Sequence, residues 1–375
     1  MTKPAPLAGI KVVELARVLA GPWAGQVLAD LGAEVAKVES PQGDETRQWG
    51  PPFVENADGT RDAAYFHATN RGKRSLVADF AKEGDRAKVI DLIREADVVI
   101  ENFKLGGLTK FGLDYESLSK INLRLVYCSI TGFGQDGPYA SRAGYDFIVQ
   151  GMSGIMDLTG DPQGLPQKIG VAYADILTGL YAVIGIQAAL RQRETTGRGQ
   201  QIDMALFDVM VGTLANQAMN ALVSGTSPLR LGNAHPNIAP YEAFPTNGGW
   251  VIVAVGNDAQ FARLAVALDF EAKAEWAGNE GRVADRAALS ELIAGRTAEW
   301  ERDALLAALE EEGIPAGPIN TVAEALADPQ IAARGMLLDM IRSDGTHVPG
   351  LRTPIRFSYA ELALGEASPE LGESA

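Results

Sequence analysis

The segment Ile10–Glu39, IKVVELARVLAGPWAGQVLADLGAEVAKVE, predicts a strand, a helix and a second strand in direct succession. The short apolar run Ile10–Leu15 is typical of a buried strand, and Leu19–Leu31 has the spacing of apolar residues that a helix needs. Gly32 ends that helix, because glycine adopts the left-handed conformation found after helices. Val35–Glu39 is the second strand. Two strands joined in this way lie parallel, with a right-handed crossover between them.

The same alternation of strands and helices continues beyond Glu39. Further strands are predicted at Leu76–Asp79, Asp97–Glu101 and Leu123–Ile130, with a helix at Arg86–Ala96. The run Gln200–Ala205 is either another strand or the start of a helix. Short apolar strands separated by helices favour a parallel sheet that is covered on both faces. The predicted fold class is therefore α/β, with an open, doubly wound, Rossmann-like parallel sheet.

The second half of the chain predicts a smaller domain. A long apolar helix from Ile176 to about Arg193 precedes a second helix from about Leu206 to Leu222. The stretch Gly225–Pro240 is rich in Gly, Pro, Asn and Ser, which is typical of a domain boundary. We predict a large α/β domain over residues 1–224, a small α+β domain over 225–330 and a C-terminal segment, 331–375, that returns to the large domain. The elements predicted after the boundary are a strand at Trp250–Val255, helices near Asp258–Leu268, Arg286–Arg296 and Glu299–Glu312, one or two helices within Asn320–Met340, and a loose tail at Gly365–Ala375.

Composition limits the partners and the compartment. The formal net charge of −15 and the pI of about 4.8 create a field that repels nucleic acid and anionic lipid, so we expect neither partner. No run reaches the roughly 18–20 apolar residues that cross a bilayer, and the N-terminal MTKPAPLAGIKVVEL does not resemble a secretion signal. The single cysteine, Cys128, lies in an apolar strand and is expected to be a core thiol. These features favour a cytoplasmic protein.

Two motifs resemble catalytic signatures without meeting their requirements. The run Gly132–Gly137, GFGQDG, matches the dinucleotide pattern G-x-G-x-x-G, but Pro138 and a polar run follow where that pattern requires a helix. It favours a glycine-rich active-site loop instead. The run Gly151–Ile155 lacks the final glycine of a nucleophile elbow, and none of the three histidines has an obvious serine or cysteine partner in the sequence. No spacing is typical of a metal site, so we expect no metal.

Basic residues follow several of the predicted strands. One group surrounds a glycine in Asn70–Ser75, NRGKRS, which suits either a phosphate group or a solvated turn. Others follow the strands that end at Glu101 and Ile130. Because ligands bind at the carboxyl ends of strands in open α/β sheets, these cations predict an anion site there. The residues concerned are Arg71, Lys73, Arg74, Lys104, Lys110 and Arg142.

Asp175 is the strongest candidate for a reactive group. It lies within Gly170–Leu180, GVAYADILTGL, directly before the long apolar helix, where a short side chain commonly accepts a backbone N–H as the N-cap. Most aspartates in such a place only cap the helix. A carboxylate is also suited to act as a nucleophile, because it is ionised at neutral pH without help from a base. Position alone leaves both roles open.

Several segments together resemble the class III coenzyme A transferases, the family of formyl-CoA, carnitine and related CoA-transferases. The resemblance covers nearly the whole chain. Each segment alone is a weak indication, whereas their combination is specific. The segments are Gly9–Glu39, NRGKRSLVADF, VIENFKLGGLTKFGLDYE, SITGFGQDGPYASRAGYDFIVQGMSG, VAYADILTGLYA and GNAHPNIAPYEAFPTNGGW.

The resemblance implies a CoA-transferase whose nucleophile is Asp175 and whose large domain binds coenzyme A or acyl-CoA as a substrate, with no tightly bound cofactor. It also implies a homodimer of two interlocked, ring-like subunits. The mobile all-glycine loop of the oxalate-using members is not evident here, and Gly248, Gly249 and Gly256 are the nearest candidates. The candidate oxyanion donors are Gly248, Gly249 and the backbone near Leu19. The residues that the resemblance places near CoA are Val18, Leu19, Ala20, Ala78, Asp79, Phe80, Asn102, Phe103, Lys104, Lys110, Tyr145 and Asp146.

Two positions bear on specificity. Leu19 stands where oxalate-using members of the family carry glutamine, which argues against formyl or oxalate substrates. Tyr145 stands where the related α-methylacyl-CoA racemases carry a histidine base. The alternatives to a transferase are a racemase or isomerase of the same fold and a CoA-binding protein without activity. The side chains that could receive the second carboxylate of a dicarboxylic acid such as succinate are Arg17, Arg47, Arg71 and His235.

Overall fold

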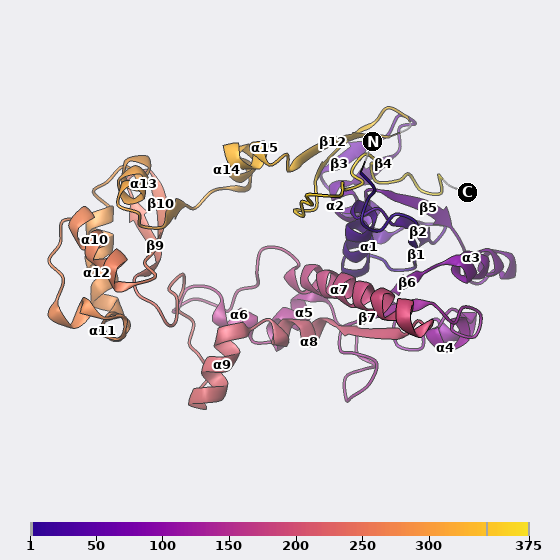
Figure 1. Ribbon diagram of the computed structural model, residues 1–375, viewed down its shortest axis with the longest axis horizontal. Coiled ribbons are helices and arrows are strands. Elements are labelled where there is room, and N and C mark those ends of the chain that lie inside the picture. The colour runs from indigo at the N-terminus through magenta and orange to yellow at the C-terminus, as the bar shows by residue number, and fades with distance from the viewer. Residues whose placement is uncertain (1–2, 343, 374–375) are drawn as a thin grey trace. The chain divides into compact units, whose positions relative to one another are not determined.

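The computed structural model describes residues 3–342 and 344–373 and divides them into two compact units. Unit 1 takes the described residues within Met1–Ile155, Lys168–Ser224 and Gln330–Ala375, and unit 2 takes Met156–Gln167 and Gly225–Pro329. The division differs from the predicted domain ranges in two places, since Met156–Gln167 groups with the second unit and Gln330 groups with the first. Figure 1 shows the elements of both units along the chain.

Unit 1 is built on a six-stranded parallel sheet, which confirms the predicted α/β class. The order β5-β2-β1-β6-β7-β8 reverses between β1 and β6, because the chain first adds strands on one side of β1 and then on the other. Val12 of β1 is accordingly in register with Val35 of β2 on one side and Val98 of β6 on the other. The strands are β1 (Lys11–Glu14), β2 (Glu34–Glu39), β5 (Lys73–Val77), β6 (Val98–Glu101), β7 (Val126–Thr131) and β8 (Gln201–Ala205).

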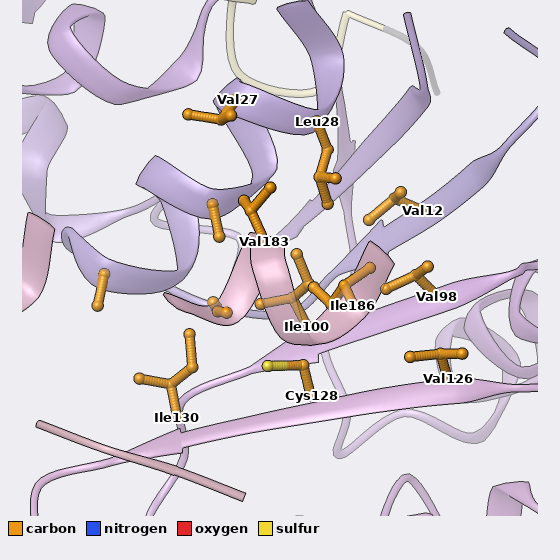
Figure 2. Packing of buried hydrophobic residues seen from close by; sticks show 14 of the residues in the cluster. Val12, Val27, Leu28, Val98, Ile100, Val126, Cys128, Ile130, Val183 and Ile186 are labelled. Atoms are coloured by element: carbon orange, nitrogen blue, oxygen red, sulfur yellow. The ribbon is translucent and has the colours of Figure 1, made fainter. Parts of the chain in front are cut away.

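Helices cover both faces of this sheet. Helices α1 (Ala20–Asp30) and α7 (Tyr173–Thr196) pack side by side on one face, as Figure 1 shows. Their apolar side chains meet Val12, Ile100 and Cys128 of the strands in one core cluster, drawn in Figure 2. Cys128 is fully buried there, as predicted, and burial raises the pKa of its thiol. The opposite face holds a second cluster around α3 (Glu83–Glu95) and α4 (Tyr115–Leu118).

Several short elements complete unit 1, and one predicted helix is broken. The expected helix Leu206–Leu222 forms as α8 (Leu206–Gly212) and α9 (Ala215–Ser224), because Ala215 takes a left-handed backbone with φ 47° that interrupts the helix. The remaining elements before α7 are η1 (Glu45–Gln48), β3 (Phe53–Glu55), β4 (Arg61–Ala63), α2 (Ala64–Asn70), η2 (Thr109–Phe111), α5 (Asp146–Met152) and α6 (Ile155–Leu158).

Helix α7 is more apolar than the sequence analysis allowed. It contains an 18-residue window with a mean hydropathy of 1.4, so by length and composition it could cross a membrane, and it is the one such helix among the described residues. Counting uninterrupted apolar residues missed it, because polar residues are interspersed. Its packing against α1 and the sheet accounts for part of that composition, since Ala182, Val183 and Ile186 lie buried in the core cluster. Only 39% of the apolar window is buried within the structure, and Ile184 is exposed.

Unit 2 contains a three-stranded antiparallel sheet in the order β11-β10-β9. Phe244 and Val251 of this sheet pack with Trp276 and Leu305 in a separate hydrophobic core. Four helices and one 3-10 turn lie between the second and third strands of the sheet in sequence. The elements are β9 (Tyr241–Thr246), β10 (Gly249–Ala254), α10 (Asp258–Ala267), η3 (Ala274–Ala277), α11 (Asn279–Ala284), α12 (Arg286–Thr297), α13 (Arg302–Glu311) and β11 (Ala316–Pro318).

The C-terminal segment differs from the prediction in two ways. The expected helices form as α14 (Val322–Ala327) and α15 (Pro329–Ala333), but the segment also contains a hairpin of β12 (Leu337–Ile341) and β13 (His347–Leu351). The expected loose tail is wrong for its described part. Ser368 is only 1% exposed, and the guanidinium of Arg342 donates to its carbonyl at 2.8 Å. Arg47 also donates to the carbonyl of Pro369, so buried arginines hold the tail through its backbone.

Candidate active site

A cavity of about 460 Å³ opens at the carboxyl ends of β1, β6 and β7, where the strand order reverses. This is the place where open α/β sheets bind ligands. The cavity contains Asp175, and ten of the residues predicted for CoA contact or catalysis line it. These are Val18, Leu19, Ala20, Asn102, Phe103, Lys104, Arg142, Tyr145, Asp146 and Asp175.

Asp175 lies in the first turn of α7 rather than at its N-cap. The N-cap is Ala172, which has no side chain to accept a hydrogen bond, so the predicted capping role of Asp175 is wrong. Another residue supplies the missing acceptor. The Asp146 Oδ1 atom accepts the backbone N–H of Ala174 at 2.8 Å and lets the helix begin at Tyr173. Asp175 therefore does not cap the helix, and its side chain lines the cavity.

Two helix N-termini meet at the Asp175 carboxylate. One is the start of α7 itself, and the other is the start of α1, where the backbone N–H of Ala20 acts on the Asp175 carboxylate and lowers its pKa. Gly179 lets the two helices come this close, because a Cβ there would lie 2.7 Å from the carbonyl oxygen of Ala20. Partial positive charge at both N-termini favours the ionised carboxylate.

The surroundings make Asp175 an unusually basic carboxylate. Burial raises its pKa, the negative charge of Asp146 raises it further, and the Ala20 N–H opposes both; the result is a pKa of about 7 against a usual value of 3.8. A carboxylate that is more basic than usual is also a stronger nucleophile. At neutral pH about half of it remains ionised.

Asp146 is itself held in place by its own neighbours. Its Oδ2 atom accepts a hydrogen bond from the Gln150 side chain at 2.8 Å, one turn further along α5. The Gln150 Oε1 atom then accepts the backbone N–H of Ile169 at 2.9 Å. This chain of hydrogen bonds fixes the carboxylate that both caps α7 and adds negative charge beside Asp175.

The predicted glycine-rich loop borders the same cavity. Gly132 and Gly144 both line it and lie back to back, since a Cβ built on either would fall 2.4 Å from the Cα of the other. No side chain fits at either position, which brings Tyr145 and Asp146 next to the end of β7. The sequence analysis did not select Gly144, although its place directly before Tyr145 was a usable signal. It also missed Glu45 and Trp49, which reach the cavity from η1 and the residue after it.

A second cavity, of about 380 Å³, adjoins the first through shared residues. Arg17 and Phe103 line both, and the guanidinium carbon of Arg17 lies 5.6 Å from the centroid of the Phe103 ring. The aromatic rings of Phe80 and Phe111 line the second cavity, together with the predicted residues Ala78 and Asp79. Predicted Lys110 lines neither cavity; its ammonium lies 4.7 Å from the Phe111 ring centroid.

The structure places the basic group of Asn70–Ser75 away from both cavities. Arg71 is buried and forms an ion pair with Asp30, and Lys73 is buried against Glu14 at 2.8 Å. Arg74 is exposed and lies 3.7 Å from Glu34, at the opposite end of the sheet from Asp175. Buried ion pairs of this kind occupy the donors that a phosphate would need. We therefore correct the prediction for Arg71 and Lys73, whose charges serve the fold of unit 1. Arg74 is exposed, but it lines neither cavity, so its predicted contact with CoA has no support in the structure.

Four residues were predicted to receive the second carboxylate of a dicarboxylic acid, and of these only Arg17 lines the cavity that contains Asp175. Arg47 is buried between Glu39 and Asp62, at 2.8 and 3.0 Å, and Arg71 is taken up by Asp30. Arg17 remains at the cavity, with Glu45 as an ion-pair partner at 2.5 Å. His235 and the pair Gly248 and Gly249 belong to unit 2, whereas Asp175 belongs to unit 1, so their roles stay predictions. The described residues contain no group of three or more metal-ligating side chains.

Comparison with known proteins adds an independent line of evidence. The family model described as CoA-transferase family III matches residues 7–375. The succinate–glutarate CoA-transferase of Agrobacterium fabrum is 59% identical over 98% of this chain and 93% of that protein. The human succinyl-CoA:glutarate CoA-transferase is 39% identical over 98% of this chain and 84% of that protein. A crystal structure of a CaiB/BaiF family protein from Brucella suis is 63% identical, with a TM-score of 0.90 over 99% of this chain and 97% of that chain.

Proposed function

The chain belongs to CoA-transferase family III and is a CoA-transferase, and we propose that it moves coenzyme A between dicarboxylic acids, with Asp175 as the covalent nucleophile. The observation that carries the proposal is the position of Asp175. Its carboxylate lines a cavity where the strand order of the sheet reverses, and burial together with the charge of Asp146 raises its pKa to about 7.

The two adjoining cavities support coenzyme A as the ligand. CoA joins a flat, charged nucleotide to a long, narrow arm that ends in the thiol. The cavity with Phe80, Phe103 and Phe111 suits the adenine ring, and the cavity that contains Asp175 suits the arm and the thioester. Lys104 and Arg142 line the cavity that contains Asp175, and neither forms an ion pair in the described part of the chain, so both are available for anionic groups.

We propose C4 and C5 dicarboxylic acids as substrates, with succinyl-CoA as donor and glutarate as acceptor. The support is the name of the relative from Agrobacterium fabrum, which is 59% identical to this chain. The cavity also contains Arg17, Lys104 and Arg142, so positive charge is present for a second carboxylate as well as for the CoA pyrophosphate. Leu19 at its edge offers no side-chain hydrogen bond.

The mechanism begins with attack of an Asp175 carboxylate oxygen on the donor thioester carbonyl. The C–S bond breaks, CoA leaves as the thiolate, and a mixed anhydride forms. The thiolate attacks the Asp175 carbonyl of the anhydride, which releases the donor acid and leaves an aspartyl-CoA thioester. The acceptor carboxylate attacks that thioester and releases the thiolate again, and the thiolate then takes the acceptor's acyl group and frees Asp175. No proton moves in any step.

Each tetrahedral intermediate carries a negative oxygen that needs hydrogen-bond donors. The Ala20 N–H favours the negative charge of the Asp175 carboxylate, so it is our candidate donor for intermediates centred on the Asp175 carbonyl. Gly248 and Gly249 stay the candidates for the intermediates on the substrate carbonyl. Because anhydrides hydrolyse, the site must exclude water during turnover.

A homodimer belongs to the proposal as well. The support is an array of exposed apolar side chains on α7 and α9 of unit 1, where Ile184, Leu222 and Val223 are 62%, 78% and 81% exposed. A second copy of the chain would cover them. Light scattering tests this, because a dimer has twice the mass of the 39.8 kDa chain. We propose the cytoplasm as the compartment, since the chain has one cysteine and that cysteine is buried.

The proposed function is tested by trapping the covalent intermediate. The protein is incubated with succinyl-CoA, treated with hydroxylamine or borohydride, digested and analysed by mass spectrometry. We expect the modification on the peptide that contains Asp175, and we expect glutaryl-CoA to form when glutarate is added. A modification elsewhere, together with full turnover by Asp175→Ala, would rule the mechanism out.

A further inference from the structure

The turn between β1 and α1 combines a strained backbone with a set of fully buried charges. Val18 takes a left-handed conformation, with φ 67°, which is rare for a β-branched residue. Such a conformation persists only where the surrounding structure enforces it, and it is common at functional sites. The residues on either side of Val18 line the cavity that contains Asp175.

Resting on the proposed function, we propose that four buried charged side chains, Glu14, Lys37, Asp44 and Lys73, act as a positioning device for Asp175. We call them the buried quartet. They hold Val18 in its left-handed conformation, and this aims the Ala20 N–H at the Asp175 carboxylate.

The turn is held by direct hydrogen bonds from both sides. The Asp44 carboxylate accepts the backbone N–H of Val18, with Oδ2 at 3.1 Å. The Lys37 ammonium donates to the carbonyl of Ala16 at 3.0 Å. The Asn102 side chain, which is outside the quartet, accepts the N–H of Arg17 at 2.9 Å and donates to its carbonyl at 2.7 Å. The backbone before and at the strained residue therefore has little freedom.

The quartet also holds the start of α1. Lys73 donates to the carbonyl of Pro22, in the first turn of that helix, at 2.9 Å. It pairs with Glu14 at 2.8 Å, and Glu14 in turn accepts from Lys37 at 3.1 Å. Lys37 and Asp44 close the set at 2.9 Å. The same four side chains thus connect the turn, at Ala16 and Val18, with the helix that begins at Ala20.

Two features show that the quartet is built into the fold. The side chains of all four residues are at most 1% exposed, and they carry two positive and two negative charges in the ionised form. Gly25 of α1 makes room for them, because a Cβ there would lie 1.8 Å from a carboxylate oxygen of Glu14. Buried ion pairs are costly and are a weak means of stabilisation, whereas they specify one arrangement of the chain.

The charges of the quartet depend on one another. Burial lowers the pKa of Lys37, but the carboxylates of Glu14 and Asp44 outweigh it and the net shift is upward. Burial raises the pKa of Asp44, and the charge of Lys37 reverses that shift and lowers it. Replacing Asp44 by Asn therefore leaves Lys37 with one buried negative charge fewer. The one amide oxygen also cannot serve both Thr46 and Val18, whose N–H groups the two carboxylate oxygens accept in wild type.

The test compares Asp44→Asn with a matched control, Asp30→Asn. Both changes replace one buried carboxylate of unit 1 by its amide, and Asp30 pairs with Arg71 at the other end of α1, away from the cavity. We expect D44N to lower kcat for CoA transfer at least tenfold with the KM for the acceptor acid unchanged within twofold. We expect D30N to lower the melting temperature and to leave kcat within twofold of wild type.

A second readout follows the ionisation of Asp175 directly. Labelling of Asp175 by a carbodiimide and an amine, read by mass spectrometry against pH, reports its pKa without any substrate. In D44N the loss of the Ala20 donor raises this pKa, whereas the loss of one negative charge nearby would lower it, so the sign of the shift separates positioning from simple electrostatics. The other charged or titratable groups near Asp175 are the same in both variants, namely Asp146, Tyr65, Arg17, Glu45, Lys104 and Arg142.

A third variant relieves the strain that the quartet is proposed to hold. Glycine adopts the left-handed conformation without a penalty, so Val18→Gly added to D44N should recover at least threefold in kcat. The inference is overturned if D44N loses only stability, with kcat and the Asp175 pKa unchanged, or if the double variant recovers nothing. If the proposed function itself is wrong, the result differs from both of these outcomes. Wild type would then transfer no CoA, while the labelling experiment would still measure the pKa of Asp175.

Discussion

The carboxylate of Asp146 accepts the backbone N–H of Ala174 at 2.8 Å and so caps the helix on which Asp175 lies. This contact links the two aspartates in two ways. It lets α7 begin before Asp175, which turns that side chain toward the cavity, and it brings a negative charge near enough to raise the pKa of Asp175. The nucleophile is thus both placed and made basic by a residue 29 positions earlier in the chain.

Replacing Asp175 is expected to abolish CoA transfer. Asp175→Ala removes the atom that forms the covalent bonds, so kcat should fall by at least about 10³-fold, as expected for loss of a covalent nucleophile. Turnover is measured by liquid chromatography of the CoA thioesters. Tight binding of CoA to the variant, measured by calorimetry, shows that the site remains folded, and unchanged turnover by that folded variant would contradict the assignment.

The rate is expected to depend on pH through Asp175. Since its pKa is raised to about 7 and the ionised form is the nucleophile, kcat should increase from pH 5 to pH 8 with a midpoint near 7. In Asp146→Asn one negative charge is lost, so the midpoint should move to lower pH. The measurement is a pH–rate profile of both proteins at saturating substrates. A midpoint that stays in place in D146N would show that Asp146 does not set the basicity of Asp175.

The raised pKa of Asp175 also predicts that its ionised carboxylate lowers the free energy of unfolding. The folded protein holds the Asp175 proton more tightly than the unfolded chain does, so the contribution of this group to the free energy of unfolding decreases as pH rises from about 4 to about 7. Asp175→Asn should therefore be more stable than wild type at pH 8, by on the order of 2 kcal/mol, with little difference at pH 4.5. Urea unfolding at both pH values measures this. The exposed Asp136→Asn is the control, and an equal gain there or at pH 4.5 would contradict the explanation.

The glycine pair at the cavity is expected to tolerate no side chain. A Cβ at Gly132 would fall 2.4 Å from the Cα of Gly144, so Gly132→Ala forces the two backbones apart and should cost about 2–4 kcal/mol of stability. Thermal unfolding measures the loss. Gly212→Ala is the matched control, because no atom lies within 4 Å of the Cβ it would add and its backbone is not left-handed. Equal melting temperatures of the two variants would show that the close approach is unimportant.

Arg71 and Arg142 were both predicted to bind CoA, and we expect their replacement to have different effects. Arg71→Ala leaves Asp30 buried without its partner and should lower stability by about 3–5 kcal/mol, with the KM for acyl-CoA unchanged. Arg142→Ala removes an exposed cation at the cavity and should raise that KM about tenfold with the melting temperature unchanged. Kinetics and thermal unfolding of both variants decide the matter, and a raised KM in folded R71A would restore its predicted role in CoA binding.

Local sequence patterns were sufficient for the strands β1, β2, β6 and β7 and for the helices α1, α3 and α7 of unit 1, whereas β5 begins at Lys73, three residues before the predicted strand Leu76–Asp79. The predicted strands Ile10–Leu15, Asp97–Glu101 and Leu123–Ile130 correspond to β1, β6 and β7, because a short apolar run has few other stable environments. The predicted anion site contained Lys104 and Arg142, both of which line the cavity after β6 and β7. The rule that parallel strands end at one edge was enough to bring them together.

What the sequence by itself determined was therefore the alternation of strands and helices, the burial of Cys128 and the candidate Asp175, since each depends on neighbours a few residues away. Only the tertiary structure decided which charged side chains are free to bind a ligand. Arg71 and Lys73 look like phosphate ligands in NRGKRS, but Asp30 and Glu14, which neutralise them, lie 41 and 59 positions earlier. The left-handed conformation of Val18 and the capping of α7 by Asp146 also depend on the tertiary structure. Both are set by contacts between segments that lie far apart in the sequence, not by neighbouring residues.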